Sequence, residues 1–204
     1  MSEGQTKAAS IDRPDLTMPD QEAATLRAAY EQADVILEYG SGGSTVLAAD
    51  MPGKHITSVE SDRKWARRMR RWFDENPPTT GTTADIVWVN IGKTKAWGHP
   101  QDHSFWRRFA DYPLAVWQRD GFRHPDVVLV DGRFRAGCAL AAAFNITRPV
   151  RLLFDDYKAR KRHHRVEEFL GAPQLAGRMA IFDVKPLTIP AHRLLQIVNF
   201  MIRP

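Results

Sequence analysis

Residues 35–44 read Val-Ile-Leu-Glu-Tyr-Gly-Ser-Gly-Gly-Ser, an apolar stretch that runs directly into a glycine-rich turn. The apolar part predicts a buried strand over residues 35–39, and a helix is expected to begin at Ser44. A second apolar stretch, residues 56–59, ends at Glu60. This order indicates the first βαβ unit of a nucleotide-binding α/β fold, because glycines let a ligand approach the backbone and the acid can bind ribose hydroxyls.

The spacing of the glycines argues against two common ligands. A dinucleotide-binding turn carries glycine at its first, third and sixth positions. Counted from Gly40, the third position is Gly42 but the sixth is Thr45, whose branched side chain crowds the helix–strand contact that a pyrophosphate site needs. The turn also lacks the Gly-Lys-Ser/Thr ending of an ATP-binding P-loop. An NAD(P)-linked oxidoreductase stays as the enzyme alternative, because it shares the βαβ unit.

The run Glu38–Ser44, an acid followed by Gly-x-Gly and small residues, resembles motif I of the class I S-adenosylmethionine (SAM)-dependent methyltransferases. Glu60 stands where that family has its ribose-binding acid. Residues 127–132, Val-Val-Leu-Val-Asp-Gly, resemble the family's fourth motif. These motifs occur in the family's order within roughly residues 21–155. The strand expected over residues 85–89 departs from the pattern, since it ends in Asn90 where many members carry an acid near the adenine.

The resemblance implies a doubly wound three-layer α/β sandwich around a seven-stranded, mostly parallel sheet. Its C-terminal end is expected to be an antiparallel hairpin, with strands near residues 179–184 and 194–202. In such folds ligands bind beyond the carboxyl ends of the strands. We therefore expect SAM to be bound by Glu38, Gly40, Ser41, Gly42, Gly43, Ser44, Glu60, Ser61, Asn90, Ile91 and Asp131.

Three groups of side chains are candidates for the chemistry. Asp131 lies where the reacting methyl group would be presented, and His99 and His103, four residues apart, offer alternative general bases. Asp131 with Asp155 and Asp156 offers oxygen ligands for Mg²⁺, an arrangement similar to that of metal-dependent O-methyltransferases. The alternative is that these acids only cap a helix or face the basic segment that follows.

The length of 204 residues fits one domain. We expect a flexible N-terminal arm over residues 1–18 and a single domain over residues 19–204. Helices are expected over residues 62–75, 104–118 and 160–170. Residues 92–126 exceed what a crossover helix needs and are interpreted as an insertion that could form a substrate lid. No stretch approaches a membrane span, and the N-terminus lacks the apolar core of a secretory signal, so a cytoplasmic protein is expected.

A small-molecule acceptor is the expected partner. The net charge of +5 permits an anionic partner without requiring one. Two basic runs, residues 63–71 and 158–165, are interpreted as a solvated helix face and as a segment near the ligand-binding mouth that could meet an acidic substrate. The sequence has neither an Asn/Asp-Pro-Pro-aromatic run nor a Pro-Cys nucleophile, so nucleobase methylation is not favoured. A non-catalytic cofactor-binding module that acts through its basic surface, and a homo-oligomer, both stay open.

Overall fold

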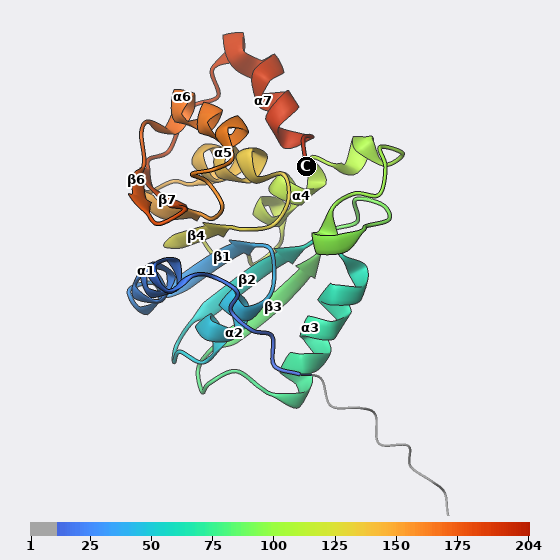
Figure 1. The fold of residues 1–204 in the computed structure, drawn as a ribbon, viewed down its shortest axis with the longest axis vertical. Coiled ribbons are helices and arrows are strands. Elements are labelled where there is room, and N and C mark those ends of the chain that lie inside the picture. The colour runs from blue at the N-terminus through green and yellow to red at the C-terminus, as the bar shows by residue number, and fades with distance from the viewer. Residues whose placement is uncertain (1–11) are drawn as a thin grey trace, which may run out of the picture.

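The computed structural model describes residues 12–204, and these form a seven-stranded sheet with helices on both faces (Figure 1). The strands are β1 (Val35–Tyr39), β2 (His55–Glu60), β3 (Thr83–Trp88), β4 (Val127–Val130), β5 (Val150–Phe154), β6 (Gln174–Ala176) and β7 (Met179–Val184). The α-helices are α1 (Asp20–Glu31), α2 (Gly43–Ala49), α3 (Arg63–Glu75), α4 (Asp111–Leu114), α5 (Arg135–Asn145), α6 (Glu167–Leu170) and α7 (Leu194–Met201). The 3₁₀ turns are η1 (Ala96–Gly98), η2 (Trp106–Arg108), η3 (Ala115–Gln118), η4 (Lys161–Val166) and η5 (Ala191–Arg193).

The order of the strands is β3-β2-β1-β4-β5-β7-β6. The first five of these strands pair in parallel, and β7 pairs antiparallel with both β5 and β6. The chain order reverses between β1 and β4, which is where open α/β sheets bind their ligands. The expected doubly wound sheet with a C-terminal antiparallel hairpin is confirmed.

The sheet separates two hydrophobic clusters. Neighbouring residues of β1 face opposite ways: Leu37 packs in the cluster that includes α4, α5 and α7, whereas Ile36 packs in the cluster that includes α1, α2 and α3. Residues Ile36 to Tyr39 of this central strand are all buried, because helices cover both faces of a parallel sheet. The mainly apolar strand of the sequence is thus buried in the interior of the sheet.

The C-terminal hairpin uses different residues from those expected. It consists of β6 and β7, joined by a turn at Gly177 and Arg178, whereas Leu194–Met201 forms helix α7 and not a strand. The expectation of a strand at residues 194–202 is therefore wrong. A short apolar run fits a strand and a buried helix equally well, and here Ile197, Phe200 and Met201 lie on one helical face that is buried against α5.

Within residues 92–126, the helical structure expected over residues 104–118 is present as three short segments, η2, α4 and η3. Pro113 lies within this stretch and lacks the N–H that a regular helix requires. The segment is nevertheless fixed to the centre of the sheet. The hydroxyl of Tyr39 donates to the carbonyl of Pro113 (2.7 Å) and accepts from the indole N–H of Trp117 (2.8 Å).

The N-terminal arm was expected over residues 1–18. Residues 1–11 lie outside the described part, and residues 12–18 follow an extended path along the surface of the domain. Leu16 and Met18 pack against the hydrophobic cluster of α1 to α3, and Arg13 forms an ion pair with Asp50. No described helix is long and apolar enough to cross a lipid bilayer.

Candidate functional site

The turn after β1 is shaped by a close approach of two backbone segments. Gly40 has a φ of +107°, and a Cβ atom at this position would lie 2.8 Å from the backbone nitrogen of Gly132. The amide of Gly40 donates to the carbonyl of Val59 (2.8 Å), and the amide of Gly132 donates to that of Tyr39 (2.5 Å). The ends of β1, β2 and β4 are thereby joined through their backbones, and only glycine fits at Gly40.

The next two glycines face different surroundings. Gly42 is extended (φ 171°), and a Cβ atom there would meet nothing within 4 Å, so this position borders open space. Its amide donates to the hydroxyl of Thr45 (3.0 Å), which fixes the start of α2. At Gly43 a Cβ atom would collide with the backbone of Asp15, so this glycine packs against the N-terminal segment.

Glu38 lies inside the protein and not on the surface of the turn. Its side chain is fully buried and accepts hydrogen bonds from the hydroxyls of Tyr30 (2.7 Å) and Thr45 (2.5 Å). Burial raises the pKa of the Glu38 carboxyl, and the hydrogen bonds oppose that rise. In this geometry Glu38 orients the loop, and its expected contact with SAM stays a prediction. The hydroxyl of the branched Thr45 side chain thus stabilises the Glu38 carboxylate by a hydrogen bond.

Glu60 connects the turn after β1 with the end of β2. One carboxylate oxygen accepts the backbone amides of Ser61 (2.6 Å) and Asp62 (2.7 Å), and the other accepts that of Ser41 (3.3 Å). Burial raises the pKa of Glu60, whereas the three amides favour its charged form. The Glu60 carboxylate is thus held in place beside the glycine turn, where it is suited to accept hydrogen bonds from the hydroxyl groups of a ligand.

A short hairpin of the insertion, residues 93–101, covers this carboxylate. An isolated bridge pairs Thr94 with Pro100, and η1 forms the tip. Two hydrogen bonds hold the hairpin against the end of β2: the hydroxyl of Thr94 donates to Asp62 (2.7 Å), and that of Ser61 donates to the carbonyl of Gly98 (2.8 Å). Residues 92–126 therefore do reach the expected ligand-binding edge.

Gly98 touches the ribose-binding candidate itself. A Cβ atom on Gly98 would lie 3.2 Å from a carboxylate oxygen of Glu60 and would collide with the hydroxyl of Ser61. The preceding residue, Trp97, has a φ of +61° and an 83% exposed side chain. An aromatic residue in this backbone region is strained. The hairpin tip thus combines a close contact with Glu60 and an exposed indole.

The end of β3 completes this half of the edge. Asn90 accepts the amide of Gly92 through its side-chain oxygen (3.0 Å), and Ile91 is buried. A Cβ atom on Gly92 would lie 2.7 Å from the ring of Phe105, so the insertion also packs over this strand end. Asn90 stays partly exposed, and its role near an adenine stays a prediction.

Asp131, at the end of β4, lies among other charged groups. Its carboxylate is 3.1 Å from the guanidinium of Arg135, and its side chain is 35% exposed. Burial raises the pKa of Asp131 to about 6, and the charges of Asp155 and Asp156 add to that rise while Arg135 opposes it. An acid with such a pKa is ionised at neutral pH and still retains affinity for a proton.

The two acids after β5 are held by arginines. Asp155 is buried and forms two hydrogen bonds with Arg178 (2.7 and 3.0 Å). Asp156 is 2.7 Å from Arg160 and 3.3 Å from Arg178. These ion pairs raise the pKa of Arg178. The acids thus belong to a network of salt bridges.

Oxygen atoms of Asp131, Asp155 and Asp156 lie within 4.8 Å of one another, as a metal site requires. However, each of the three carboxylates already contacts a guanidinium, from Arg135, Arg160 or Arg178. A divalent cation would have to displace these positive groups or lie beside them. The donor set in this arrangement does not fit Mg²⁺.

The two histidines of the insertion contact other residues of the insertion. His99 is in the hairpin, where its Nδ1 atom is 3.0 Å from the carbonyl of Pro100. His103 is exposed, and its ring lies 6.0 Å from that of Phe109. Among the hydrogen bonds and ring contacts of the described residues, neither histidine reaches Asp131. Their role as bases stays a prediction.

Two kinds of site residue were missed by the sequence reasoning. Tyr112 reaches from α4 to the junction of β1, β2 and β4, where its hydroxyl donates to the carbonyl of Val59 (3.2 Å) and blocks any side chain at Gly132. Arg135 and Arg178 neutralise the acids. Nothing local distinguishes Arg178, which comes from the β6–β7 turn; Arg135 could have been noticed because it lies four residues after Asp131.

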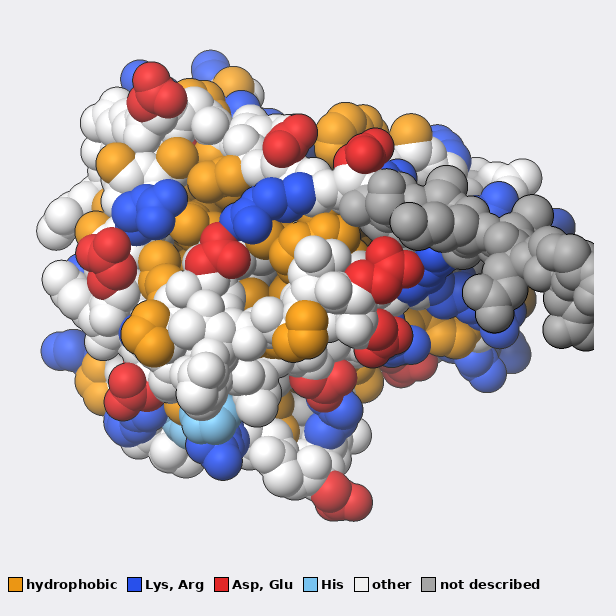
Figure 2. All heavy atoms as spheres, turned by 90° about the horizontal axis from the view of Figure 1, so that it is seen from below, with side chains coloured by type: hydrophobic (Ala, Val, Ile, Leu, Met, Phe, Trp, Pro, Cys, Tyr) orange, Lys and Arg blue, Asp and Glu red, His pale blue; other side chains and the backbone are white. Residues whose placement is uncertain are grey.

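The basic run of residues 63–71 is an exposed face of α3. Arg63 and Arg68 lie over the rings of Trp88 and Trp65, at 5.2 and 5.4 Å from their centroids, and Arg70 donates to the carbonyl of Ile86. Figure 2 shows Lys and Arg side chains gathered on the right of the view, the side on which Figure 1 shows α3. Several of these arginines therefore cover their own domain.

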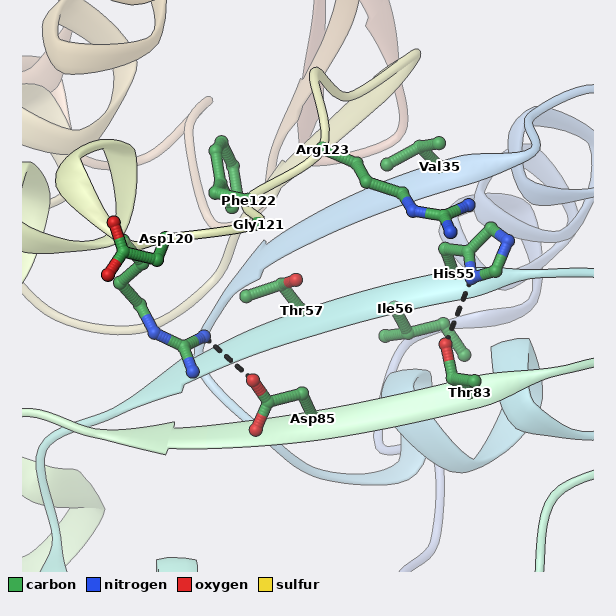
Figure 3. A pocket seen from close by; sticks show the side chains of 11 residues that line it. Val35, His55, Ile56, Thr57, Thr83, Asp85, Asp120, Gly121, Phe122 and Arg123 are labelled. Atoms are coloured by element: carbon green, nitrogen blue, oxygen red, sulfur yellow. Dashed lines mark hydrogen bonds and ion pairs between the residues drawn. The ribbon is translucent and has the colours of Figure 1, made fainter.

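A shallow hollow of about 170 Å³ lies at the amino ends of the strands, opposite the carboxyl ends that carry the glycine turn (Figure 3). Its wall includes the first residues of three strands, Val35, His55 and Thr83, together with the segment 119–123. An ion pair between Arg119 and Asp85 (2.7 Å) closes one side. This hollow is lined by amino ends of strands and contains no residue of the glycine turn.

The chain resembles solved structures of methyltransferases. A methyltransferase-like protein from Silicibacter pomeroyi is 64% identical and superposes with a TM-score of 0.92, over 94% of this chain and 99% of that one. The O-methyltransferase TomG from Streptomyces achromogenes, in complex with SAM, shares the fold at 15% identity (TM-score 0.53, 83% and 81% of the two chains). An O-methyltransferase from Bacillus cereus in complex with SAH does so at 14% identity (TM-score 0.53, 86% of each chain). No family model and no curated protein matches the chain.

Proposed function

Since the chain belongs to the class I SAM-dependent methyltransferases, we propose that it transfers the methyl group of SAM to an oxygen or nitrogen atom of a small acceptor. One observation carries the proposal. The glycine turn, the Glu60 carboxylate and Asp131 end three adjacent parallel strands at the switch point of the sheet, and Gly42 leaves the space beside them open.

The residues present fit an adenosyl ligand at this edge. The backbone of Ser41 and Gly42 would lie against it, and Glu60 would accept its ribose hydroxyls. Asn90 and Ser61 would flank the adenine. When bound, SAM supplies a methyl group on a positively charged sulfur that an acceptor atom can attack in line. The protein contributes alignment, which in the best oriented reactions lowers barriers by about 7–11 kcal/mol.

Asp131 is the residue we assign to proton transfer. Its pKa of about 6 leaves the carboxylate ionised at neutral pH. As the acceptor atom bonds to the methyl group, its O–H or N–H proton passes to an oxygen of Asp131. Arg135, 3.1 Å away, holds the carboxylate in place from the first turn of α5. The partial exposure of Asp131 allows an acceptor to approach.

The hairpin of residues 93–101 must shift for a ribose to reach Glu60. Gly98 lies against the carboxylate, and the hydrogen bond from Thr94 to Asp62 keeps it there. We infer that the hairpin opens to admit the cofactor and then covers it. Such loops exclude water from the reaction and complete the site.

Calorimetric titration with S-adenosylhomocysteine (SAH), the demethylated product, tests the proposal. We expect saturable binding at a single site, with a Kd of about 1–100 µM, a range typical of enzyme ligands. The Glu60→Gln variant should bind SAH more weakly, and NADH should not bind. Absence of SAH binding to the wild-type protein would refute the proposal, and binding of NADH instead would favour an oxidoreductase.

A further inference from the structure

The carboxyl ends of β4 and β5 carry more positive than negative side chains. Three arginines, namely Arg135, Arg160 and Arg178, pair with the three aspartates described above. Arg133 and Arg162 lie in the same region, and neither has an ion pair with any carboxylate of residues 12–204. Two guanidinium groups are therefore left without a direct ion pair at the edge that also carries Asp131.

These two arginines lie close to other positive groups. Burial lowers the pKa of Arg133, and the charges of Arg135 and Arg160 lower it further. Burial likewise lowers the pKa of Arg162, with contributions from Arg160, Arg203 and Arg135. Like charges repel, so this arrangement is unfavourable in the absence of an anion and would be relieved by one.

Two buried polar atoms in this cluster have no partner. The Nε atom of Arg133 and the Nε2 atom of His163 are both buried without a hydrogen bond in the described structure. His163 is only 7% exposed, and its ring packs against Phe154 with the centroids 5.2 Å apart. Buried polar atoms in native proteins are nearly always paired, and an orphaned one suggests an absent ligand or water.

The unpaired nitrogen atoms of Arg133 and His163 belong to side chains that have the same arginines as neighbours. Burial is the main cause that lowers the pKa of His163 to about 3, followed by the charges of Arg162, Arg135 and Arg160. Arg135 and Arg160 are also positively charged neighbours of Arg133. The imidazole is therefore neutral, and its Nε2 atom can donate one hydrogen bond to an anion. The unpaired guanidinium groups and the unpaired imidazole belong to one cluster.

We propose that Arg133, Arg162 and His163 form a subsite for an anionic group of the methyl acceptor, a carboxylate or a phosphate. The inference rests on the proposed function, because it assigns the substrate class of the same site. Arginine presents parallel N–H donors that match the oxygen pairs of both groups. An acceptor anchored in this way places its remaining hydroxyl or amino group toward Asp131, which lies among the charged neighbours of Arg133.

The test uses inorganic phosphate and acetate as probes of the two chemistries. Each is titrated into the wild-type protein at constant ionic strength, and binding is followed by NMR at the imidazole resonances of the histidines. We expect a saturable shift of one buried imidazole with at least one probe. The Arg133→Gln and Arg162→Gln variants should weaken that binding by about 5- to 20-fold each, since a charge-assisted hydrogen bond is lost. Tighter phosphate than acetate binding identifies a phosphorylated acceptor, and the reverse identifies a carboxylic acid.

The matched control is Arg67→Gln, which removes an exposed arginine of α3 and should leave anion binding unchanged. The inference is overturned if neither probe binds saturably to the wild-type protein, or if binding is equal in wild type and Arg162→Gln. SAH titration of the same samples separates the two proposals. Loss of anion binding with SAH affinity retained in Arg162→Gln supports the subsite. A wild-type protein that binds phosphate but not SAH has an anion site but refutes the proposed function, and with it the assignment of that site to a methyl acceptor.

Discussion

The two halves of the ligand-binding edge are built in different ways. At the ends of β1 and β2, the acids Glu38 and Glu60 are buried, and each accepts two or more hydrogen bonds from hydroxyls or backbone amides. At the ends of β4 and β5, the acids pair with arginine side chains, and two arginines remain unpaired. In the first half the carboxylates therefore already receive their hydrogen bonds from the protein. In the second half there are more arginines than carboxylates, so positive charge is in excess.

This difference matches our proposal that the first half binds the cofactor and the second half binds the methyl acceptor. A cofactor of constant shape can be bound by backbone atoms in a fixed turn, because backbone positions are set by the fold. An acceptor must be recognised by side chains, which differ from one protein to another. Substitutions in each half should therefore affect different properties, and the largest effect is expected at Gly42.

Gly42→Leu should abolish SAH binding without unfolding the protein. The backbone at Gly42 is extended, and a side chain there meets no protein atom within 4 Å, so it would occupy the space assigned to the cofactor. We expect a loss of affinity of about 100-fold or more by calorimetry, because a filled pocket excludes its ligand. The melting temperature should be almost unchanged.

The contrasting variant is Gly40→Ala, which should destabilise the fold because of the positive φ and the approach of Gly132. Unchanged SAH affinity in Gly42→Leu would show that the cofactor binds elsewhere.

Glu60→Gln tests the other contact of the cofactor half. The substitution removes the charge and places an amide nitrogen where one carboxylate oxygen now accepts a backbone amide. We expect SAH affinity to fall by about 10-fold or more, since hydrogen bonds to a charged acceptor contribute about 1.5–3 kcal/mol. Glu75→Gln, at the exposed end of α3, is the control. Equal affinities would exclude a ribose contact at Glu60.

Thr94→Val tests the hairpin as a cover. The variant loses the hydrogen bond to Asp62 that holds residues 93–101 against β2. We expect SAH to associate about 5-fold faster in stopped-flow fluorescence, because a net hydrogen bond contributes about 1 kcal/mol to the closed state. Thr79→Val, which removes a hydroxyl bonded to the carbonyl of Asp50, should leave the rate unchanged. No change in Thr94→Val would argue against a hairpin that opens.

Asp131→Asn should stabilise the protein, but only at higher pH. The folded protein raises the pKa of Asp131 to about 6 from an ordinary value of 3.8, so the folded state binds this proton more tightly than the unfolded state. Wild-type stability therefore falls as the pH rises from 3.8 to about 6, and the penalty is complete above that pH. The variant avoids it.

We expect the free energy of unfolding of Asp131→Asn to exceed that of wild type by about 1 kcal/mol at pH 8, after allowance for partial exposure, and by little at pH 4. Urea titrations at the two pH values measure the difference. Asp183→Asn, whose side chain is 69% exposed on β7, should show no such pH dependence. A uniform effect of Asp131→Asn at both pH values would contradict the raised pKa.

Local sequence determined the cofactor half well. The apolar run before Gly40, the spacing of the glycines and the position of Glu60 are all set within about 25 residues, because a βαβ unit is a local structure. The family resemblance that these residues carry implied the doubly wound sheet. Sequence could not distinguish strand from helix for Leu194–Met201, since only packing against α5 decides which face of an apolar run is buried.

The contacts between segments far apart in the sequence were decided by the tertiary structure. Arg178 reaches Asp155 from a turn 23 residues away in sequence, and Tyr112 reaches Val59 across 53 residues. Whether Gly98 covers Glu60, or Arg133 lacks a carboxylate, depends on which segments the fold brings together. Charge and hydrogen-bond balance are properties of neighbours in space, so the sequence specified which groups this protein carries, and the folded chain determined which of them remain unpaired.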